Sequence, residues 1–210
     1  LESIAKQRFS GNSVMVIFQG KQARWSFTTP GIPDKLFSRG SAPMTKEEIR
    51  TIVLAKARIK KDSTLYDIGA GTGSISIEAA LLAKNGKVFA VEKNPDRISL
   101  INKNIKKFRV SNVEVVEGEA PEVLKALPKA DRIIIGGSGG RIESILRKCN
   151  EMLKVGGRVV VNAIRPETLK TSIEVLKKLN YSFRITRVSI NRIETSEVLN
   201  PVFIIDAERR

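Results

Sequence analysis

The most informative part of this sequence is the run Leu65-Tyr66-Asp67-Ile68-Gly69-Ala70-Gly71-Thr72-Gly73-Ser74. An apolar segment ends at Asp67, three alternate glycines follow, and an apolar pattern with helical spacing begins at Ser74. A parallel α/β sheet places such a turn at the carboxyl end of its first strand, where ligands bind. Glycine lets the backbone approach a ligand closely, and the amide groups that begin the next helix favour an anionic group such as a carboxylate.

The glycine spacing separates two classes of cofactor. The dinucleotide fingerprint is G-x-G-x-x-G, with an acidic residue about 20 positions later. This chain has G-x-G-x-G, with Asp67 two residues before the first glycine. That pattern resembles the first motif of the class I S-adenosylmethionine methyltransferases, in which Asp67 would face the ammonium and nearby sulfonium of the cofactor. A tight turn in another α/β protein, or a different nucleotide site, is the alternative.

Composition limits the kind of protein. With 210 residues, of which 41% are hydrophobic, the chain has room for one full α/β domain and an appendage. It contains no histidine, so zinc catalysis and Ser-His-Asp chemistry are effectively excluded and no metal is expected. No apolar run is long enough for a transmembrane helix, and no membrane partner is expected. There is no signal-peptide pattern, and because the first residue is Leu we expect a fragment of a longer protein.

The single cysteine and the net charge add two expectations. Cys149 lies in a helical pattern and is predicted to be a buried, inert thiol, which is compatible with the cytoplasm. The charge of +15, from 37 Lys and Arg against 22 Asp and Glu, predicts attraction to polyanions. Nucleic acid, a membrane surface or a polycarboxylate substrate would each fit. Because the basic residues are spread along the chain, a generally basic surface is the alternative.

Strands and helices alternate from Thr64 onward, which predicts a doubly wound α/β fold. The strands are expected near 64–69, 87–92, 113–117, 131–136 and 158–164, and the helices near 74–84, 95–108, 121–127, 141–153 and 166–179. Two further strand-like runs, 181–190 and 201–206, are joined by about ten polar residues without a helix and should pair antiparallel. A mostly parallel sheet closed by an antiparallel C-terminal hairpin is the Rossmann-like class I methyltransferase topology.

The N-terminal part reads differently. Residues 1–28 contain one apolar strand, 14–18, between polar glycine-containing stretches, so they are an appended strand or the tail of a preceding domain. Residues 29–210 form the main domain. Within it, Thr45 and Glu48 make a capping box, and the predicted helix that follows carries apolar residues at Ile49, Ile52, Val53 and Ala57.

Acidic residues follow the second and third predicted strands. Glu92 lies 19 residues after Gly73, where a carboxylate would accept both ribose hydroxyls of a cofactor; the alternative is a solvated charge. Glu119 and Ala120 follow the next strand, where the side chain would reach the exocyclic amine of adenine and the Ala120 amide would reach the ring. For Glu119 the alternative is an acid favoured by a helix dipole.

The fourth strand ends in Gly136-Gly137-Ser138-Gly139-Gly140, where the methyl-accepting atom is expected. Amino-directed nucleic-acid methyltransferases place Asn/Asp-Pro-Pro-aromatic here, to hold a flipped base. Glycines instead leave room for a bulky substrate and offer amide groups to anions, so Gly137, Ser138 and Gly139 are substrate-site candidates. A flexible turn into the next helix is the alternative.

Several motifs together resemble the precorrin (or cobalt-precorrin) carbon-15 methyltransferases of the cobalamin pathway, which also decarboxylate their substrate. The resemblance runs from about Pro30 to the C-terminus. Besides the glycine turn, it is carried by Pro30-Gly31-Ile32-Pro33-Asp34, Ala42-Pro43-Met44-Thr45-Lys46-Glu47-Glu48, Gly118-Glu119-Ala120-Pro121, Gly136-Gly137-Ser138-Gly139-Gly140 and Asn200-Pro201-Val202. Residues 1–18 resemble the tail of the carbon-5 methyltransferase of the same pathway. The two enzymes are often fused, so we expect the C-terminal part of a bifunctional precorrin-6Y methyltransferase.

This resemblance implies S-adenosylmethionine as cofactor and contacts to it from Thr45, Gly69–Gly73, Glu92 and Ala120. Glu119 stands where the family often has Asp, so its longer side chain departs from the family pattern. The implied substrate is a macrocycle with many acetate and propionate groups, and Arg165 and Arg192 are candidate partners for them, or simple surface charge. The family often forms tetramers. No general acid or base is identified.

Two alternatives remain at this stage. A tRNA or rRNA methyltransferase of the same fold would fit the charge, but the chain has only 8 Phe, 2 Tyr and Trp25, and no base-clamping motif. Nucleic acid is therefore not the expected partner. A non-catalytic module that binds cofactor or tetrapyrrole is the second alternative, and the intact Asp67 and Glu92 argue against it.

Overall fold

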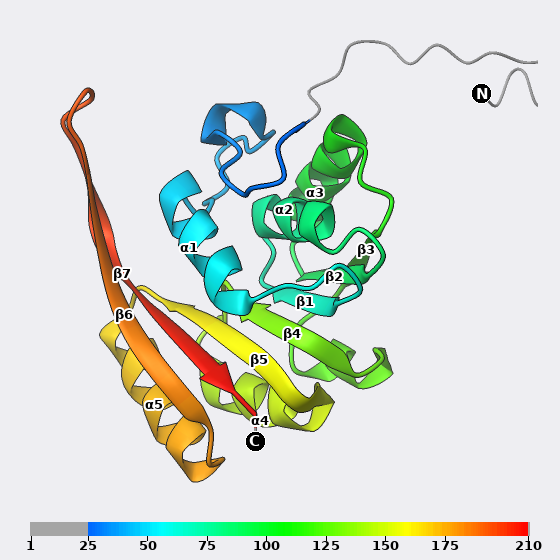
Figure 1. Cartoon of the computed structure of the whole chain (residues 1–210), viewed down its shortest axis with the longest axis vertical. Helices are drawn as coiled ribbons and strands as arrows, with labels where there is room; N and C mark the ends of the chain where they lie inside the picture. Colours follow the sequence, from blue (N-terminus) through cyan, green and yellow to red (C-terminus); the bar gives the residue numbers. More distant parts are fainter. Residues whose placement is uncertain (1–24, 210) are drawn as a thin grey trace, which may run out of the picture.

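The computed structural model describes residues 25–209, which form a seven-stranded sheet in the order β3-β2-β1-β4-β5-β7-β6 (Figure 1). Strands β1 to β5 are parallel, and β7 runs antiparallel to both β5 and β6. This arrangement confirms the predicted mostly parallel sheet with an antiparallel C-terminal hairpin. The strands are β1 Thr64–Ile68, β2 Lys87–Glu92, β3 Val113–Glu117, β4 Ala130–Ile135, β5 Leu153–Ala163, β6 Ser182–Arg192 and β7 Glu197–Glu208. The strand expected at 14–18 lies outside the described residues.

Helices cover both faces of the sheet, as the alternating pattern predicts (Figure 1). Helices α1 to α3 pack on one face, and α4 and α5 pack on the other. The helices are α1 Glu47–Ala57, α2 Ser74–Leu82, α3 Pro95–Phe108, α4 Ile142–Met152 and α5 Pro166–Lys178, with short 3-10 turns η1 Asp34–Leu36 and η2 Glu122–Ala126. No helix among residues 25–209 is both long and apolar enough to cross a membrane.

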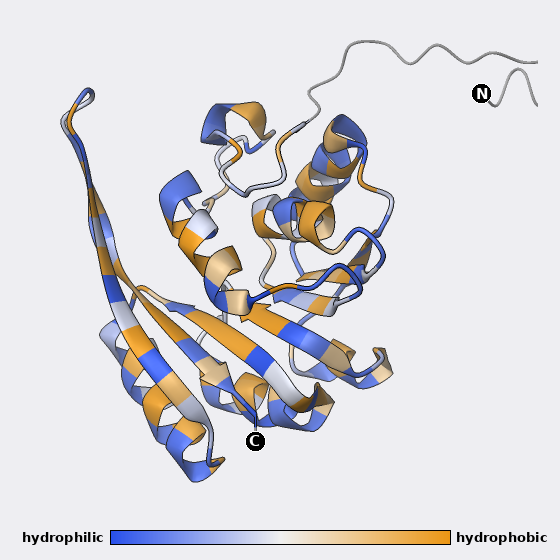
Figure 2. Ribbon diagram, viewed as in Figure 1, coloured by the Kyte–Doolittle hydropathy of each residue, from blue (hydrophilic) through white to orange (hydrophobic). Residues whose placement is uncertain are grey.

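Alternation along the strands builds two apolar cores, because successive side chains of a strand point to opposite faces. Leu65, Ile134 and Val160 pack against α1 to α3. The intervening residues, such as Tyr66 and Ile133, pack against α4 and α5. In Figure 2, β4 and β5 are mostly apolar, whereas polar and apolar residues alternate along the terminal hairpin.

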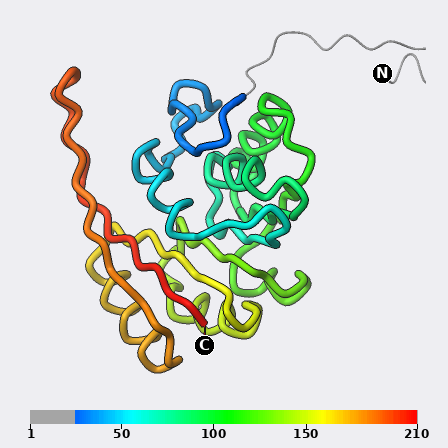
Figure 3. The backbone as a smooth tube through the Cα atoms, viewed as in Figure 1, coloured from blue at the N-terminus to red at the C-terminus, as the bar shows by residue number. Residues whose placement is uncertain are grey.

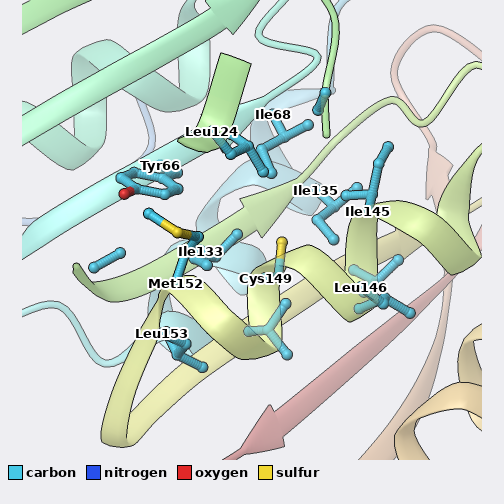
Figure 4. Close-up of a cluster of buried hydrophobic side chains, with 14 of the residues drawn as sticks. Tyr66, Ile68, Leu124, Ile133, Ile135, Ile145, Leu146, Cys149, Met152 and Leu153 are labelled. Carbon is cyan, nitrogen blue, oxygen red and sulfur yellow. The ribbon is translucent and has the colours of Figure 1, made fainter. Parts of the chain in front are cut away.

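The core against α4 encloses the one cysteine. Figure 4 shows the Cys149 sulfur pointing from α4 toward the sheet, near Ile133 and Ile135. The side chain is buried, and burial raises the pKa of its thiol well above the ordinary value. A thiolate would be strongly disfavoured here. These observations agree with the prediction of an inert structural thiol.

Three boundaries differ from the sequence prediction. Strand β5 begins at Leu153 rather than near 158, because Leu153 already pairs with Ala130 before a register shift in the ladder. The segment 121–127 forms a 3-10 turn rather than an α-helix. The polar residues expected to form a long loop continue the hairpin instead, and only residues 193–196 turn the chain. The hairpin therefore extends well beyond the body of the domain (Figure 3).

The capping box predicted at Thr45 is wrong. Helix α1 begins at Glu47, and its N-cap residue Lys46 makes no side-chain capping bond. The Thr45 carbonyl accepts a hydrogen bond from the buried Arg50 (2.6 Å), and the Glu48 carboxylate accepts two bonds from Arg192 (2.8 Å each). The helix thus begins one residue after the position that the box requires, and Arg192 of the hairpin holds the carboxylate that would have completed the box.

A buried ionic cluster fixes the segment that leads into α1. The Arg50 guanidinium is fully buried and donates to Glu78 (2.5 Å) and to Asp34 (3.1 Å). The Glu78 carboxylate also accepts the backbone amides of Gly31 (2.7 Å) and Ile32 (3.2 Å). This cluster holds residues 31–46 against α2 and so brings Thr45 to the carboxyl edge of the sheet.

Candidate active site

The glycine turn after β1 has the backbone geometry that its sequence implies. Gly69, Gly71 and Gly73 all have positive φ angles, of 72°, 60° and 75°, a region that side chains disfavour. A Cβ on Gly69 would lie 2.6 Å from the Gly137 carbonyl oxygen. Glycine is therefore required at position 69 both by the dihedral angle and by the contact between the loops after β1 and β4.

Asp67 is buried beneath this turn with one oxygen available. Its side chain is 1% exposed, and Oδ2 accepts a hydrogen bond from the Ser76 hydroxyl at 2.5 Å. Oδ1 has no hydrogen-bond partner among the described residues. Burial, with a smaller contribution from the charge of Glu92, raises the pKa of Asp67 to about 6. A buried carboxylate with a free oxygen is suited to meet a cationic group of a ligand.

Glu92 ends β2 and holds the turn in place. Its Oε2 accepts the backbone amide of Gly71 (2.9 Å), and its Oε1 accepts the amides of Lys93 and Asn94 (3.0 Å each). Each carboxylate oxygen has two lone pairs, so Oε2, which accepts only the Gly71 amide, keeps the capacity to accept a hydroxyl group, whereas Oε1 already accepts two amides. Asn104 adds a second support that the sequence did not indicate, since its amide donates to the Thr72 carbonyl at 2.9 Å.

Glu119 and Ala120 lie with Glu92 around one cavity of about 150 Å³, which we call the β3-side cavity. It is lined by the ends of the first four strands, the loops that follow them, and one residue each of α3 and α4. The lining residues are Ile68, Gly69, Val91, Glu92, Lys93, Arg97, Gly118, Glu119, Ala120, Gly137, Ser138, Gly139 and Ile145. The Glu119 carboxylate is at the rim, where Lys93 (2.8 Å) and Arg141 (3.6 Å) pair with it. Ala120 is buried.

A second cavity of about 350 Å³, the β5-side cavity, adjoins the first and shares Gly69, Gly137 and Arg97 with it. Its walls come from the glycine turn, the segment before α1, the end of β5 and the hairpin. They are Pro43, Met44, Thr45, Lys46, Ile49, Asp67, Gly69, Ala70, Gly71, Thr72, Ser74, Ile75, Arg97, Gly136, Gly137, Asn162, Ile164, Leu199, Asn200 and Val202. The predicted residues Thr45 and Asp67 therefore meet here.

The predicted substrate residues are distributed unevenly. Gly137 lines both cavities, whereas Ser138 and Gly139 line only the β3-side cavity. Arg165 is exposed at the start of α5 and lines neither cavity. Arg192 also lines neither, because its guanidinium is bound to Glu48 and Glu197, and this bonding raises its pKa.

Sequence reasoning missed the residues that close the β5-side cavity opposite the glycine turn. These are chiefly Met44, Asn162, Ile164 and Leu199, together with Asn200 and Val202. Met44, Asn200 and Val202 belong to motifs that were noted as family markers, but they were given no structural role. Among residues 25–209, no group of three or more Cys, Asp or Glu side chains is arranged to hold a metal ion.

The two cavities fit an amino acid joined to a nucleoside better than a dinucleotide. The free Asp67 oxygen and the unbonded, buried Thr72 hydroxyl offer polar contacts beside the turn. Glu92 and the buried Ala120 lie on the other side of Gly69. The β5-side cavity would then take the amino acid part of S-adenosylmethionine, and the β3-side cavity would take the ribose and the base.

Comparison with known proteins identifies the family. A model described as "Precorrin methyltransferase domain" matches residues 35–199. The chain belongs to the precorrin methyltransferase family. It is 41% identical over 196 residues to a "Probable cobalt-precorrin-6B C(15)-methyltransferase (decarboxylating)" of Saccharolobus solfataricus, covering 88% of this chain and 98% of the relative.

Solved structures agree with this family assignment. A crystal structure titled "Precorrin-6y C5,15-methyltransferase" from Geobacter metallireducens has a TM-score of 0.83 and 40% identity, covering 87% of this chain and 98% of that one. A "SAM-dependent O-methyltransferase" from Thermotoga maritima shares the fold at a TM-score of 0.65 and 17% identity, over 80% of this chain and 67% of that one. The chain is thus a methyltransferase with the class I fold, whose family and fold imply use of S-adenosylmethionine.

Proposed function

We propose that this chain methylates carbon 15 of a precorrin-type tetrapyrrole with S-adenosylmethionine and removes a ring acetate carboxyl group as carbon dioxide, in cobalamin (vitamin B12) biosynthesis. The observation that carries this proposal is the free Asp67 oxygen at the glycine turn, beside a roomy cavity, in a chain of the precorrin methyltransferase family. The Saccharolobus relative is named for methylation at carbon 15 and for decarboxylation, which supports the position and the second reaction. The family assignment leaves the RNA methyltransferase and non-catalytic alternatives without support.

The proposed cofactor contacts follow from the two cavities. When bound, S-adenosylmethionine supplies an electrophilic methyl group carried on a sulfonium. Asp67 would hold the ammonium, and Gly69, Ala70, Gly71, Thr72 and Gly73 would approach the cofactor through their backbone. Glu92 would accept the ribose hydroxyls. The Ala120 amide would bind the adenine ring, and Glu119 would reach its exocyclic amine from the rim, which requires it to loosen its pairing with Lys93.

Positive charge lies where a polycarboxylate substrate would extend beyond the cavity. A groove of about 500 Å³, which we call the basic groove, adjoins the β5-side cavity through Pro43 and Arg97. Its charged lining residues are the three cations Arg39, Arg97 and Lys103 and one acid, Asp96. Within the described residues, Arg39 and Lys103 have no ion-pair partner. We propose that these two cations attract the peripheral carboxylates of the macrocycle.

The chain's own contribution to methyl transfer is alignment and exclusion of water. Displacement at a sulfonium methyl group requires an in-line approach in a dry site more than a strong base. Gly136 and Gly137 leave room for the macrocycle edge, and the apolar side chains of Met44, Ile49 and Val202 line the same cavity. The nucleophile is a carbon of the electron-rich ring, and we assign no general base among the described residues.

The remaining expectations are part of the proposal. We propose that residues 1–28, of which 1–24 lie outside the described structure, are the tail of a preceding carbon-5 methyltransferase domain. The name of the Geobacter protein, a C5,15-methyltransferase, supports the association of the two activities. A homo-oligomer, tetrameric as is common in this family, is also proposed. The buried thiol of Cys149 is compatible with the cytoplasm, where we place the reaction.

Methyl transfer by the purified chain tests the proposal. Methyl-labelled S-adenosylmethionine would be supplied with a precorrin mixture in one reaction and with total tRNA in another, and Asp67→Asn would serve as the matched control. We expect label in the tetrapyrrole, and little label from the Asp67→Asn variant. Label in tRNA alone would refute the proposal. Tight cofactor binding with label in neither acceptor would favour a binding module.

A further inference from the structure

Asn162 lies near the carboxyl end of β5, on the wall of the β5-side cavity opposite Asp67. It follows Val161, which pairs with Ile135 of β4, and so stands beside Gly136 across the edge of the sheet. It shares the sheet face of Val160, which packs toward α1 to α3, and Asp67 shares that face with Leu65. Through Ile134 of β4, Asp67 is level with Val160, two residues before Asn162, so Asp67 and Asn162 are roughly 12 Å apart across the sheet.

Both polar atoms of the Asn162 side chain are buried without a hydrogen-bond partner, which is true of no other side chain in residues 25–209. Within the described residues, six buried side-chain atoms have no hydrogen bond: Asp34 Oδ2, Asp67 Oδ1, Thr72 Oγ1, Asn162 Nδ2, Asn162 Oδ1 and Asp206 Oδ1. The two outside the cavity still face a cation, since Asp34 Oδ2 lies 3.8 Å from Arg192 and Asp206 Oδ1 lies 3.4 Å from Lys56. The other four belong to residues that line the β5-side cavity.

A buried amide with both polar atoms unpaired costs stability, so it requires an explanation. The proposed cofactor site explains the unpaired atoms of Asp67 and Thr72, because both residues belong to the glycine turn. Asn162 lies across β4 from that turn, beside the glycines where the methyl acceptor is expected. Its partner on β7 is the apolar Ile204, and Ile164, Leu199 and Val202 line the same cavity, together with the polar Asn200. The amide is therefore placed to bind the substrate rather than the cofactor.

An amide suits a carboxylate that must be lost. Its Nδ2 group donates a hydrogen bond without supplying a positive charge, so the carboxylate is oriented but keeps its own charge. The two cations that line this cavity are already near carboxylates, Lys46 at 3.7 Å from Glu197 and Arg97 at 3.9 Å from Glu92. A carboxylate that exchanges water for apolar walls is destabilised relative to a transition state in which its charge spreads into the ring.

We propose that Asn162 forms the subsite for the acetate carboxylate that leaves as carbon dioxide. This inference rests on the proposed function. The bond between the acetate methylene carbon and the carboxyl carbon breaks, and its electron pair enters the conjugated ring. Carbon dioxide leaves, and a proton from water completes a methyl group on the ring. Asn162 positions the carboxylate for this step and takes no part in the proton transfer.

The test separates decarboxylation from methylation in one assay. The full chain is incubated with labelled S-adenosylmethionine and precorrin substrate, and the tetrapyrrole products are resolved by mass. For Asn162→Leu, which keeps the volume and removes the polar atoms, we expect methyl transfer to persist while the ratio of decarboxylated to intact product falls at least tenfold. Cofactor affinity should stay within about twofold of the wild type. Asn102→Leu, the same change at an exposed position of α3, should behave as wild type.

Other outcomes would overturn the assignment. An unchanged product ratio in Asn162→Leu would show that the amide does not orient the leaving carboxylate. A tenfold loss of cofactor affinity would make Asn162 a cofactor contact instead. If Asn162→Leu does not fold by thermal melting, Asn162→Ala is measured in its place with the same criteria. Failure of the wild-type chain to methylate any tetrapyrrole would overturn the proposed function and this inference together. An unchanged product ratio in Asn162→Leu, with an active wild type, would overturn this inference alone.

Discussion

Cofactor affinity should depend on pH through Asp67. Burial raises the pKa of this carboxyl from 3.8 to about 6 in the free protein. A shift of about two units corresponds to roughly 3 kcal/mol against the charged form. A bound ammonium or sulfonium favours the carboxylate, so binding requires that Asp67 lose its proton. With a pKa of about 6, the apparent affinity should be about tenfold weaker at pH 5 than at pH 7.

Rising pH affects folding stability in the opposite direction: ionisation of Asp67 strengthens cofactor binding but destabilises the folded chain. Between pH 3.8 and about 6, the folded chain keeps a proton on Asp67 that the unfolded chain has released. The contribution of this group to stability is therefore full below pH 3.8 and is lost as pH rises through about 6. Cofactor binding should restore part of that stability above pH 6, where the bound cation compensates for the buried charge.

Isothermal titration calorimetry between pH 5 and pH 7.5 would measure this dependence. Asp67→Asn should bind the cofactor weakly and with no slope in this range. The hydrogen bond from Ser76 to Oδ2 lowers the pKa of Asp67. Ser76→Ala removes this bond, so the midpoint of the pH dependence of cofactor affinity should move to higher pH. A flat profile for the wild type, or an equal slope in Asp67→Asn, would refute the assignment of Asp67 to the cationic part of the cofactor.

Three further predictions concern the turn, the basic groove and the buried cluster. Gly69→Ala should abolish cofactor binding in calorimetry and destabilise the fold by more than about 1 kcal/mol, because the new methyl group would meet the Gly137 carbonyl at positive φ; wild-type affinity would contradict the described contact. Arg39→Ala combined with Lys103→Ala should raise the KM for tetrapyrrole about tenfold in steady-state assays, because two charge-assisted contacts are lost. Cofactor affinity should not change. An unchanged KM would show that the basic groove does not bind the substrate. Arg50→Ala should lower stability by about 3–5 kcal/mol in denaturant titrations, since it leaves a buried carboxylate unpaired; a loss below 1 kcal/mol would show that the cluster is not important.

The glycine turn could be predicted from sequence because its determinants are local. Asp67 and the three glycines carry their geometry within a few residues, and Glu92 follows from the strand that must lie beside them. The alternation of strands and helices likewise fixes the topology through apolar periodicity. These parts of the site rest on short-range chemistry, so a single sequence was sufficient to predict them.

The missed features depend on contacts between distant segments. The capping box failed because α1 begins at Glu47, one residue later than the box requires, and because Arg192 of the hairpin binds the Glu48 carboxylate. The polar run 191–200 was read as a loop, yet it pairs as strands in a hairpin that projects from the domain and buries little surface. Asn162 ends an apolar run and gave no signal of its own, since its importance arises only when β5 meets the glycine turn across β4.

The most direct test of the account is the structure of the tetrapyrrole product formed by the purified chain. S-adenosylmethionine with a carbon-13 methyl group would be used, and the product would be examined by mass spectrometry and carbon-13 NMR. The account predicts one labelled methyl group at carbon 15 and the loss of one carbon dioxide in the same molecule. A labelled methyl group at another carbon, or methylation without loss of carbon dioxide by the wild-type chain, would contradict it.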